Sequence, residues 1–166
     1  MNAPFPVEVL GQQHDRKAFS SGVAALDRYF HEQVTQDVRR RVTACCVAVD
    51  AATGRAAGYY TPAASGIPLI DMPEALTKRL PRYPMVPVAR LGRLAVDAAY
   101  QGRRVGAMLL WDAATRAVRS EGAVFAVVVD AKDERAEAFY RHHGFALFGS
   151  LPRQLILSLT NFSGRA

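Results

Sequence analysis

The unbroken apolar segment Ala123–Val129 is the feature that most constrains the fold of this chain. Strands buried on both faces read as continuous hydrophobic runs, whereas strands with one solvated face alternate between apolar and polar residues. The segment lies between two stretches with helical spacing, Ala107–Glu121 and Asp133–His143. Alternating strands and helices are typical of a parallel sheet covered by helices. We therefore expect this segment to be a central strand.

The first half of the chain has an antiparallel character. Val7–Leu10 indicates a short edge strand, and the apolar spacing between Ser21 and Arg40 is helical. Two extended segments, Thr43–Asp50 and Ala56–Pro62, are separated by turn residues, which predicts a hairpin. Together with the later alternation, this predicts an α/β fold with a mixed central sheet and helices on both faces.

The remaining segments complete the expected order. Pro73–Leu80 predicts a short helix, and the prolines in Leu80–Pro87 end it and indicate an exposed loop. Val88–Val96 is a strand candidate, and Phe145–Leu159 is extended with a break at Pro152. A chain of 166 residues has the usual size of one domain, so we predict a single domain over residues 1–166.

Composition narrows the class of protein. Half of the residues are hydrophobic and 22% are charged, which argues against extended disorder. No apolar run approaches the roughly 18 residues of a membrane span, and the start lacks a signal-peptide pattern, so we expect a cytoplasmic protein. Adjacent Cys45 and Cys46 indicate buried, reduced thiols, and adjacent His142 and His143 diverge on a helix, so we expect no metal. The net charge of +6 favours nucleic acid or a pyrophosphate-bearing cofactor as a partner.

The loop Gln101–Ala107, between a predicted strand and a predicted helix, is the strongest candidate for a binding site. It places a run of backbone N–H groups at the positive end of a helix, and such ends bind anions. It contains neither the GxGxxG of a dinucleotide-binding fold nor the GK[ST] ending of a P-loop. Taken alone, its two glycines are equally consistent with simple turn geometry.

In its context the loop resembles the cofactor motif of the GNAT acetyltransferases, Gln/Arg-x-x-Gly-x-Gly/Ala. The first and sixth positions lie at Gln101 and Gly106, with Ala107 directly after them, whereas Arg104 replaces the central glycine. An arginine fits there if its backbone stays right-handed, and its guanidinium can then meet a phosphate by two hydrogen bonds. A second segment, Ala136–Phe145, resembles the family's later A-x-x-F-Y-x-x-x-G-F sequence. Two matches in the family's order make the resemblance specific.

The resemblance implies acetyl-coenzyme A (acetyl-CoA) as the acetyl donor and no metal. It implies that Tyr140 protonates the departing thiolate, although base rates alone favour a half-buried helix aromatic with a surface hydroxyl. It also implies that the strand before the loop hydrogen-bonds the pantetheine arm like an added strand. The cofactor-binding residues implied in this way are Leu94, Ala95, Val96, Gln101, Gly102, Arg103, Arg104, Val105, Gly106, Ala107 and Phe139.

Further segments resemble a bacterial toxin branch of that family, whose members acetylate aminoacyl-tRNA and thereby block translation. These segments include Leu26–Phe30, Gly58–Thr61, Leu80–Pro84 and Val129–Lys132. The branch implies acetylation of the α-amine of the amino acid on tRNA, a ribbon-helix-helix antitoxin and a homodimer. An α-amine has an unperturbed pKa of about 7.7–8.0, so an appreciable fraction of the amine groups is neutral and nucleophilic at neutral pH. The reaction then needs no dedicated general base. This suits a sequence in which no convincing general base stands out.

Basic residues in and around the predicted loop Leu80–Pro87 are candidate contacts to tRNA, and functions other than tRNA acetylation are also consistent with the sequence. Basic residues are also commonly just a solvated surface. A small-molecule or protein amine is an alternative acceptor, although like charges disfavour a polycationic one. A non-catalytic acetyl-CoA sensor and a nucleic-acid-binding module are alternatives from other classes. The candidate tRNA contacts are Lys78, Arg79, Arg82, Arg90 and Arg93.

Overall fold

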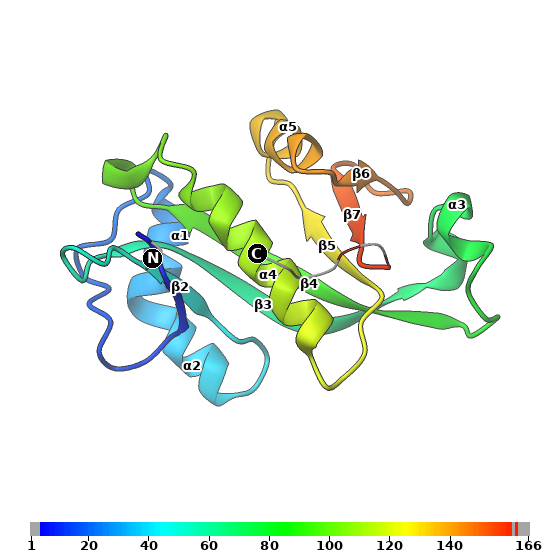
Figure 1. Cartoon of the computed structure of the whole chain (residues 1–166), viewed down its shortest axis with the longest axis horizontal. Helices are drawn as coiled ribbons and strands as arrows, with labels where there is room; N and C mark the ends of the chain where they lie inside the picture. Colours follow the sequence, from blue (N-terminus) through cyan, green and yellow to red (C-terminus); the bar gives the residue numbers. More distant parts are fainter. Residues whose placement is uncertain (1–3, 161, 163–166) are drawn as a thin grey trace. The chain divides into compact units, whose positions relative to one another are not determined.

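The computed structural model describes residues 4–160 and 162. Its strands form one seven-stranded sheet in the order β1-β2-β3-β4-β5-β7-β6 (Figure 1). Strands β4 and β5 pair in parallel, whereas β1 with β2, β2 with β3, β5 with β7 and β6 with β7 pair antiparallel. The prediction of a mixed sheet is thus confirmed. Within residues 4–160 and 162, no helix is both long and apolar enough to cross a membrane.

Contacts within the chain define two compact units, which we describe separately. The first unit is Met1–Ala63 with Gly92–Asp112, and the second is Ala64–Leu91 with Ala113–Ala166. The prediction of a single domain stays a prediction. Three elements have residues in both units: β3 (Ala56–Pro68), β4 (Met85–Val96) and α4 (Val105–Arg119).

The first unit holds the N-terminal hairpin and helices. Strand β2 pairs with β3 so that Val47 lies opposite Tyr59, which confirms the predicted hairpin. Where the sequence predicts one continuous helix, a π-helical turn of five residues separates α1 from α2 and buries Tyr29 and Phe30. The elements of the first unit are β1 (Val7–Val9), α1 (Ala24–Arg28), the π turn η1 (Tyr29–Gln33), α2 (Val34–Arg39), β2 (Cys46–Val49) and the 3-10 turn η3 (Ala98–Tyr100).

Aromatic packing forms the core of the first unit. The rings of Phe30 and Tyr59 stack with centroids 4.3 Å apart and planes 6° from parallel. Phe19 meets both rings edge-on, at 4.9 Å and 5.5 Å. The Tyr59 hydroxyl donates a hydrogen bond of 2.7 Å to the Leu26 carbonyl, so its polar atom is satisfied inside the core. The π turn and β3 are therefore fixed to each other.

Cys45 packs in this aromatic core, and both adjacent cysteines are buried, as the sequence predicts. Cys45 and Cys46 are both buried and neither forms a disulfide. Burial raises the pKa of the Cys45 thiol to about 12, and the neighbouring Cys46 adds to the shift. Cys45 therefore stays a neutral thiol and acts as a small apolar side chain.

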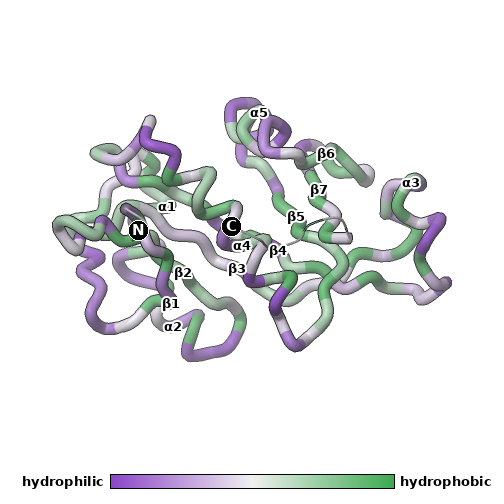
Figure 2. Tube along the Cα trace, in the orientation of Figure 1, coloured by the Kyte–Doolittle hydropathy of each residue, from purple (hydrophilic) through white to green (hydrophobic). Residues whose placement is uncertain are grey.

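The second unit is built around β5. Residues Ala126–Val129 are buried, which confirms the predicted interior strand, although it begins at Ala126 rather than at Ala123. Figure 2 shows β5 as a hydrophobic strand. The helix that follows begins after Asp133, whose carboxylate accepts a hydrogen bond of 2.8 Å from the Ala136 N–H. The elements of the second unit are the 3-10 turn η2 (Leu69–Asp71), α3 (Glu74–Thr77), β5 (Ala126–Asp130), α5 (Glu134–His142), β6 (Ala146–Leu147) and β7 (Gln154–Ser158).

Several predicted boundaries are wrong; strand β3, for example, continues to Pro68 instead of ending at Pro62. Strand β4 begins at Met85 rather than Val88, so the loop after α3 is shorter than Leu80–Pro87. Helix α4 begins at Val105 rather than Ala107, because Arg104 already supplies the carbonyl for its first turn. Helix ends are the part of a pattern that sequence periodicity locates least well.

Replacement of Phe30 by alanine tests the aromatic core. The side chain is wholly buried, so Phe30→Ala should lower the free energy of unfolding by about 3–5 kcal/mol. Val42→Ala is the matched control, because Val42 is 62% exposed and its truncation should cost less than about 0.5 kcal/mol. Urea unfolding followed by circular dichroism measures both. Similar losses in the two variants would contradict this description of the core.

Candidate functional site

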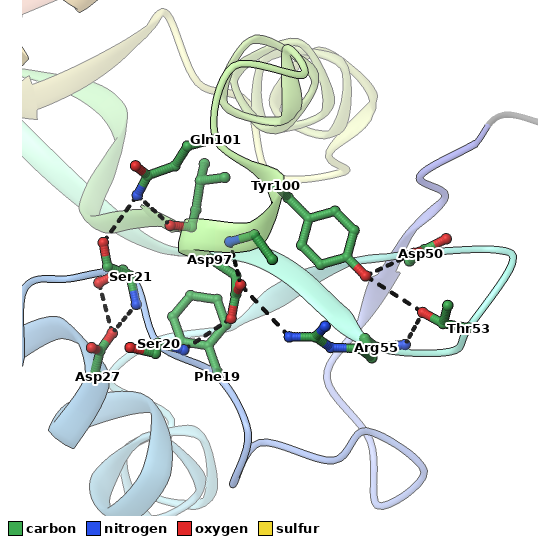
Figure 3. Close-up of polar contacts among 12 residues, drawn as sticks. Phe19, Ser20, Ser21, Asp27, Asp50, Thr53, Arg55, Asp97, Tyr100 and Gln101 are labelled. Atoms are coloured by element: carbon green, nitrogen blue, oxygen red, sulfur yellow. Dashed lines mark hydrogen bonds and ion pairs between the residues drawn. The ribbon is translucent and has the colours of Figure 1, made fainter.

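A buried carboxylate fixes the start of the loop Gln101–Ala107. One oxygen of Asp97 accepts a hydrogen bond of 2.9 Å from the Ser20 N–H, and the other accepts one of 2.9 Å from the Ala99 N–H (Figure 3). The Arg55 guanidinium lies 3.8 Å from the second oxygen. Two N–H donors and a nearby cation compensate the burial of this charge. Asp97 therefore ties the end of β4 to the segment before α1.

Gln101 strengthens the same connection. Its side-chain amide nitrogen donates to the Ser21 carbonyl at 3.0 Å and to the Val96 carbonyl at 3.1 Å (Figure 3). Ser21 is itself held by Asp27, which accepts from the Ser21 hydroxyl at 2.6 Å. Both N–H donors of the Gln101 side chain are thus used within the protein. In this structure Gln101 positions the predicted cofactor loop through its side-chain amide.

Helix α4 begins directly after the loop and presents donors at its first turn. The Met108 N–H donates to the Arg104 carbonyl at 3.1 Å, which is the first bond of the helix. The N–H groups of Val105, Gly106 and Ala107 therefore precede that bond and have no acceptor within the helix. Arg103 and Arg104 beside them are exposed. Aligned N–H groups with adjacent guanidinium groups suit a pyrophosphate.

The backbone of Arg104 is left-handed, so the expected right-handed conformation of an arginine at this position is wrong. Its φ is 65°, in the left-handed region, and Gly102 in the same loop has a φ of 82°. A left-handed conformation costs a residue with a Cβ about 1–2 kcal/mol, whereas glycine adopts it freely. The loop therefore keeps a backbone that suits the motif's usual glycine, although an arginine occupies the position.

Strand β4 is shaped by a close approach to β3 within the first unit. A Cβ atom at Gly58 would lie 2.9 Å from the Ala95 carbonyl oxygen, which is too close for any side chain. Ala95 packs into the aromatic core, whereas Leu94 and Val96 are half-buried. Since side chains alternate along a strand, Leu94 and Val96 face away from that core. The segment Leu94–Val96 leads directly into the Asp97 turn.

Tyr140 lies in the second unit, on α5. The side chain is 9% exposed and packs edge-on against Phe139 at 5.3 Å and Phe145 at 5.5 Å. Among residues 4–160 and 162, no group hydrogen-bonds its hydroxyl. Burial raises the pKa of Tyr140 to about 12, so the hydroxyl stays protonated at neutral pH. The side chain is therefore more buried than the interpretation of Tyr140 as a half-buried helix aromatic expects, although its hydroxyl is not among the buried polar atoms without a partner.

The two histidines after Tyr140 pack against neighbouring rings. His143 meets Phe139 edge-on at 4.8 Å and His142 at 5.1 Å. Burial lowers the pKa of His143, and the neighbouring His142 adds to the effect. In the described part of the chain, no cluster of three or more histidine, cysteine, aspartate or glutamate residues could hold a metal ion.

The structure separates the five predicted tRNA contacts into two groups. Arg90 pairs with Asp130 at 2.6 Å, and the Arg93 guanidinium lies 3.4 Å from the centre of the Tyr29 ring. The Tyr29 hydroxyl in turn donates to Asp37. Three cations are exposed and make no ion pair with any residue described in the structure: Lys78, Arg79 and Arg82.

Sequence reasoning missed the residues that hold the loop. The contacts that hold the loop join residues far apart in the sequence, because Asp97 accepts from the Ser20 N–H and Gln101 donates to the Ser21 carbonyl. The one local signal is the Asp97 side chain capping the short turn after it, a common role for aspartate. Tyr29 lies in the segment Leu26–Phe30 that carries the family resemblance, but the sequence does not reveal that its ring supports Arg93.

Comparison with known proteins gives consistent matches over most of the chain. The model of the acetyltransferase (GNAT) family matches residues 18–145. A tRNA-acetylating toxin of Mycobacterium tuberculosis is 34% identical over 145 residues, which are 86% of this chain and 85% of the relative. A mutant of KacT has a TM-score of 0.84 at 25% identity, covering 95% of this chain and 96% of its own. AtaT complexed with acetyl-methionyl-tRNAfMet has a TM-score of 0.82 at 25% identity, covering 93% and 94%.

Paired substitutions at Arg104 test the strained loop. Arg104→Gly and Arg104→Ala remove the same charge, but only glycine relieves the left-handed backbone. The glycine variant should be about 1 kcal/mol more stable than the alanine variant in urea unfolding. The same pair at Arg103, whose φ is not positive, is the control and should show the opposite order. Equal stabilities at Arg104 would contradict the left-handed assignment.

Proposed function

The chain belongs to the acetyltransferase (GNAT) family, and from this premise we propose that it acetylates the α-amine of the amino acid carried by a tRNA. It is an N-acetyltransferase with acetyl-CoA as the donor. The observation that carries the choice of acceptor is the 34% identity to a tRNA-acetylating toxin over 86% of the chain. AtaT, which has a similar fold, is known in complex with an acetylated aminoacyl-tRNA. Acetylation removes the amine that translation requires, so the reaction inhibits protein synthesis.

On the donor side, the first turn of α4 binds the pyrophosphate of acetyl-CoA. The N–H groups of Val105, Gly106 and Ala107 point out of the helix end, and their partial charge favours an anion. Arg103 and Arg104 add charge-assisted hydrogen bonds. Gly102, in the left-handed region, shapes the same loop. Gln101 holds the loop in place, and its side-chain N–H groups donate to carbonyls of the protein rather than to the ligand.

The pantetheine arm of acetyl-CoA follows strand β4 in this proposal. Backbone groups of Leu94, Ala95 and Val96 supply hydrogen bonds as a neighbouring strand would. Phe139 offers an apolar ring to the thioester end. The strand is suited to this role because Asp97 and Gln101 hold its end rigidly.

Tyr140 acts on the departing sulfur. The amine nitrogen bonds to the acetyl carbon and the carbon–sulfur bond breaks; overall the amine loses one proton and the sulfur gains one. A hydroxyl with a pKa of about 12 is fully protonated at neutral pH, so it is always ready to donate a hydrogen bond to the thiolate. Because a thiol has a pKa near 8.5, the hydroxyl is the weaker acid, and it stabilises the developing charge as well as relaying a proton.

On the acceptor side, the unpaired cations Lys78, Arg79 and Arg82 bind RNA phosphates. Phosphate contacts supply most of the sequence-independent affinity for nucleic acid. Arg90 has its charge neutralised by Asp130, and Arg93 is stacked on a buried ring, so both contribute less than the sequence alone suggests.

We extend the proposal to partners and location. A toxin of this kind needs a neutralising partner in the cell that makes it, and we propose a ribbon-helix-helix antitoxin. We also propose a homodimer in the cytoplasm. Size-exclusion chromatography with light scattering, with and without the product of the neighbouring gene, tests both.

Label transfer from acetyl-CoA tests the proposed acceptor. Purified protein is incubated with labelled acetyl-CoA and, separately, with charged tRNA, uncharged tRNA, polyamines and a lysine peptide. Label on charged tRNA alone supports the proposal. Label on a small amine or on the peptide would replace it with an ordinary N-acetyltransferase. Bound cofactor without any label transfer would indicate an acetyl-CoA sensor, and RNA binding without cofactor binding would indicate a nucleic-acid-binding module.

Removal of one hydroxyl tests Tyr140. Tyr140→Phe should lower kcat by about 10²-fold with little change in the KM for either substrate, because only the proton donor is lost. Tyr60→Phe is the control, since Tyr60 is also buried and its hydroxyl bonds Asp112. Steady-state kinetics and circular dichroism follow both variants. A Tyr140→Phe enzyme with normal turnover would remove Tyr140 from this role.

The pH profile tests the assignment of the two titrating groups. The wild-type rate should rise between about pH 6.5 and 8.5, because the α-amine loses its proton with a pKa of about 7.7–8.0. It should not fall again within that range, because the raised pKa of Tyr140, about 12, keeps its hydroxyl protonated. A falling limb between pH 7 and 8.5 would show that another acid controls the reaction.

Neutralising one exposed arginine tests the acceptor side. Arg82→Gln should raise the KM for charged tRNA several-fold, leave the KM for acetyl-CoA unchanged, and reduce the salt dependence of tRNA binding by about one phosphate contact. Arg90→Gln is the matched control, because the Asp130 carboxylate already neutralises Arg90. Equal effects of the two substitutions would contradict this separation of the basic residues.

A further inference from the structure

The segment Leu69–Met85 of the second unit, which we call the arm, is anchored on one side and exposed on the other. Its two ends are tied by a hydrogen bond of 2.9 Å from the Leu69 N–H to the Pro84 carbonyl. Figure 1 shows α3 within this segment, beyond the ends of β3 and β4. The side chains that pack on the core cluster of the second unit, Leu69, Met72, Leu76 and Leu80, hold the arm in place.

The exposed side of the arm presents an aromatic ring. Tyr83 is 69% exposed, and among residues 4–160 and 162 it makes no hydrogen bond or ring contact. Pro81 and Pro84 lie close to it in the sequence, and the fixed φ of proline limits the motion of this stretch. A large ring held on a stiff, anchored loop loses little conformational entropy when a flat partner stacks on it.

Three cations lie near this ring in the sequence, and no carboxylate of the described residues neutralises them. Lys78, Arg79 and Arg82 follow α3 and have no ion-pair partner in the described part of the chain. The acidic residues of the arm are Asp71, which ends η2, and Glu74, the first residue of α3, and neither forms an ion pair with these cations. Figure 2 shows the hydrophilic stretch of chain after α3.

We propose that Tyr83 stacks on an unpaired base of the acceptor RNA while Lys78, Arg79 and Arg82 bind the adjoining phosphates. This rests on the proposed function and specifies how the acceptor is held. Sites for single-stranded nucleic acid combine cations that follow the backbone with aromatic rings on which bases stack. Bases inside a duplex are already stacked on each other, so only an unpaired nucleotide, such as those of the tRNA end that carries the amino acid, can use the ring.

An RNA strand suits this surface better than a protein does. Three unneutralised cations next to a protein interface would be costly to desolvate without matching carboxylates. RNA supplies a regular series of phosphates together with flat bases, which matches cations and a ring in one short segment. Stacking also tolerates any base, so the arm would serve acceptors of different sequence.

Substitution of Tyr83 gives the kinetic test. Tyr83→Leu should raise the KM for charged tRNA by about tenfold and leave kcat and the KM for acetyl-CoA unchanged, because one stacked base is lost. Tyr83→Phe should behave like the wild type, since the ring remains. Ile70→Ala is the matched control, because Ile70 is 92% exposed on the same arm but offers no ring.

Fluorescence gives a direct test that does not depend on turnover. Trp111 is the only tryptophan, so Tyr83→Trp in a Trp111→Phe background carries a single reporter at the proposed stacking position. Its emission should be quenched by a short single-stranded RNA oligonucleotide and by tRNA, and not by a blunt RNA duplex. Quenching by the duplex alone would overturn the proposal. So would an absence of quenching by both the single-stranded oligonucleotide and tRNA.

The outcomes separate this inference from the function on which it rests. If the wild type acetylates charged tRNA but Tyr83→Leu does so with an unchanged KM, the inference fails and the proposed function stands. If the wild type does not acetylate charged tRNA, the proposed function fails, and quenching by single-stranded RNA then still reports whether the arm binds RNA. If light scattering shows that Tyr83→Leu and Ile70→Ala both dissociate an oligomer, the arm is a protein interface and the inference is overturned.

Discussion

The buried carboxylate of Asp97 is the interaction on which the conformation of the loop Gln101–Ala107 depends. It receives hydrogen bonds from the Ser20 and Ala99 N–H groups, and Gln101 adds bonds to the carbonyls of Ser21 and Val96. These bonds fix where β4 ends and where α4 begins, and thus where the free N–H groups of α4 point. An anion site made of backbone groups is only as well defined as the backbone that carries it, and here side chains far away in the sequence provide that definition.

Arg104 shows how a motif can change its residue and keep its geometry. The left-handed backbone at this position costs an arginine about 1–2 kcal/mol, which glycine would not incur. The core around Phe30 and Tyr59 and the polar bonds of Asp97 hold the loop firmly enough to tolerate this cost. In the proposed mode of cofactor binding, the compensating gain is a cation directly at the helix end, next to the pyrophosphate. The arginine at position 104 therefore introduces both the backbone strain and the positive charge.

The sequence predicts those features that local pattern controls. The interior strand β5 follows from its unbroken apolar run, the β2–β3 hairpin from its turn residues, and the start of α5 from Asp133. Features that depend on contacts between distant segments were not predictable: the π turn that buries Tyr29 and Phe30, and the left-handed φ of Arg104. Neither leaves a periodic trace, because each is imposed by packing or hydrogen bonds that close only in the folded chain.

The same limit applies to charge, and it bears on function. A net charge of +6 indicates an affinity for polyanions but does not say which arginines provide it. Arg90 and Arg93 look equivalent to Arg82 in the sequence, yet Asp130 neutralises the first and the Tyr29 ring holds the second. Of the five predicted tRNA contacts, only Lys78, Arg79 and Arg82 make neither an ion pair nor a ring contact with a described residue, and all three lie on the arm beside the exposed Tyr83. The distribution of unpaired cations therefore carries more functional information than their number, because only a cation without a partner in the protein gains fully from a phosphate.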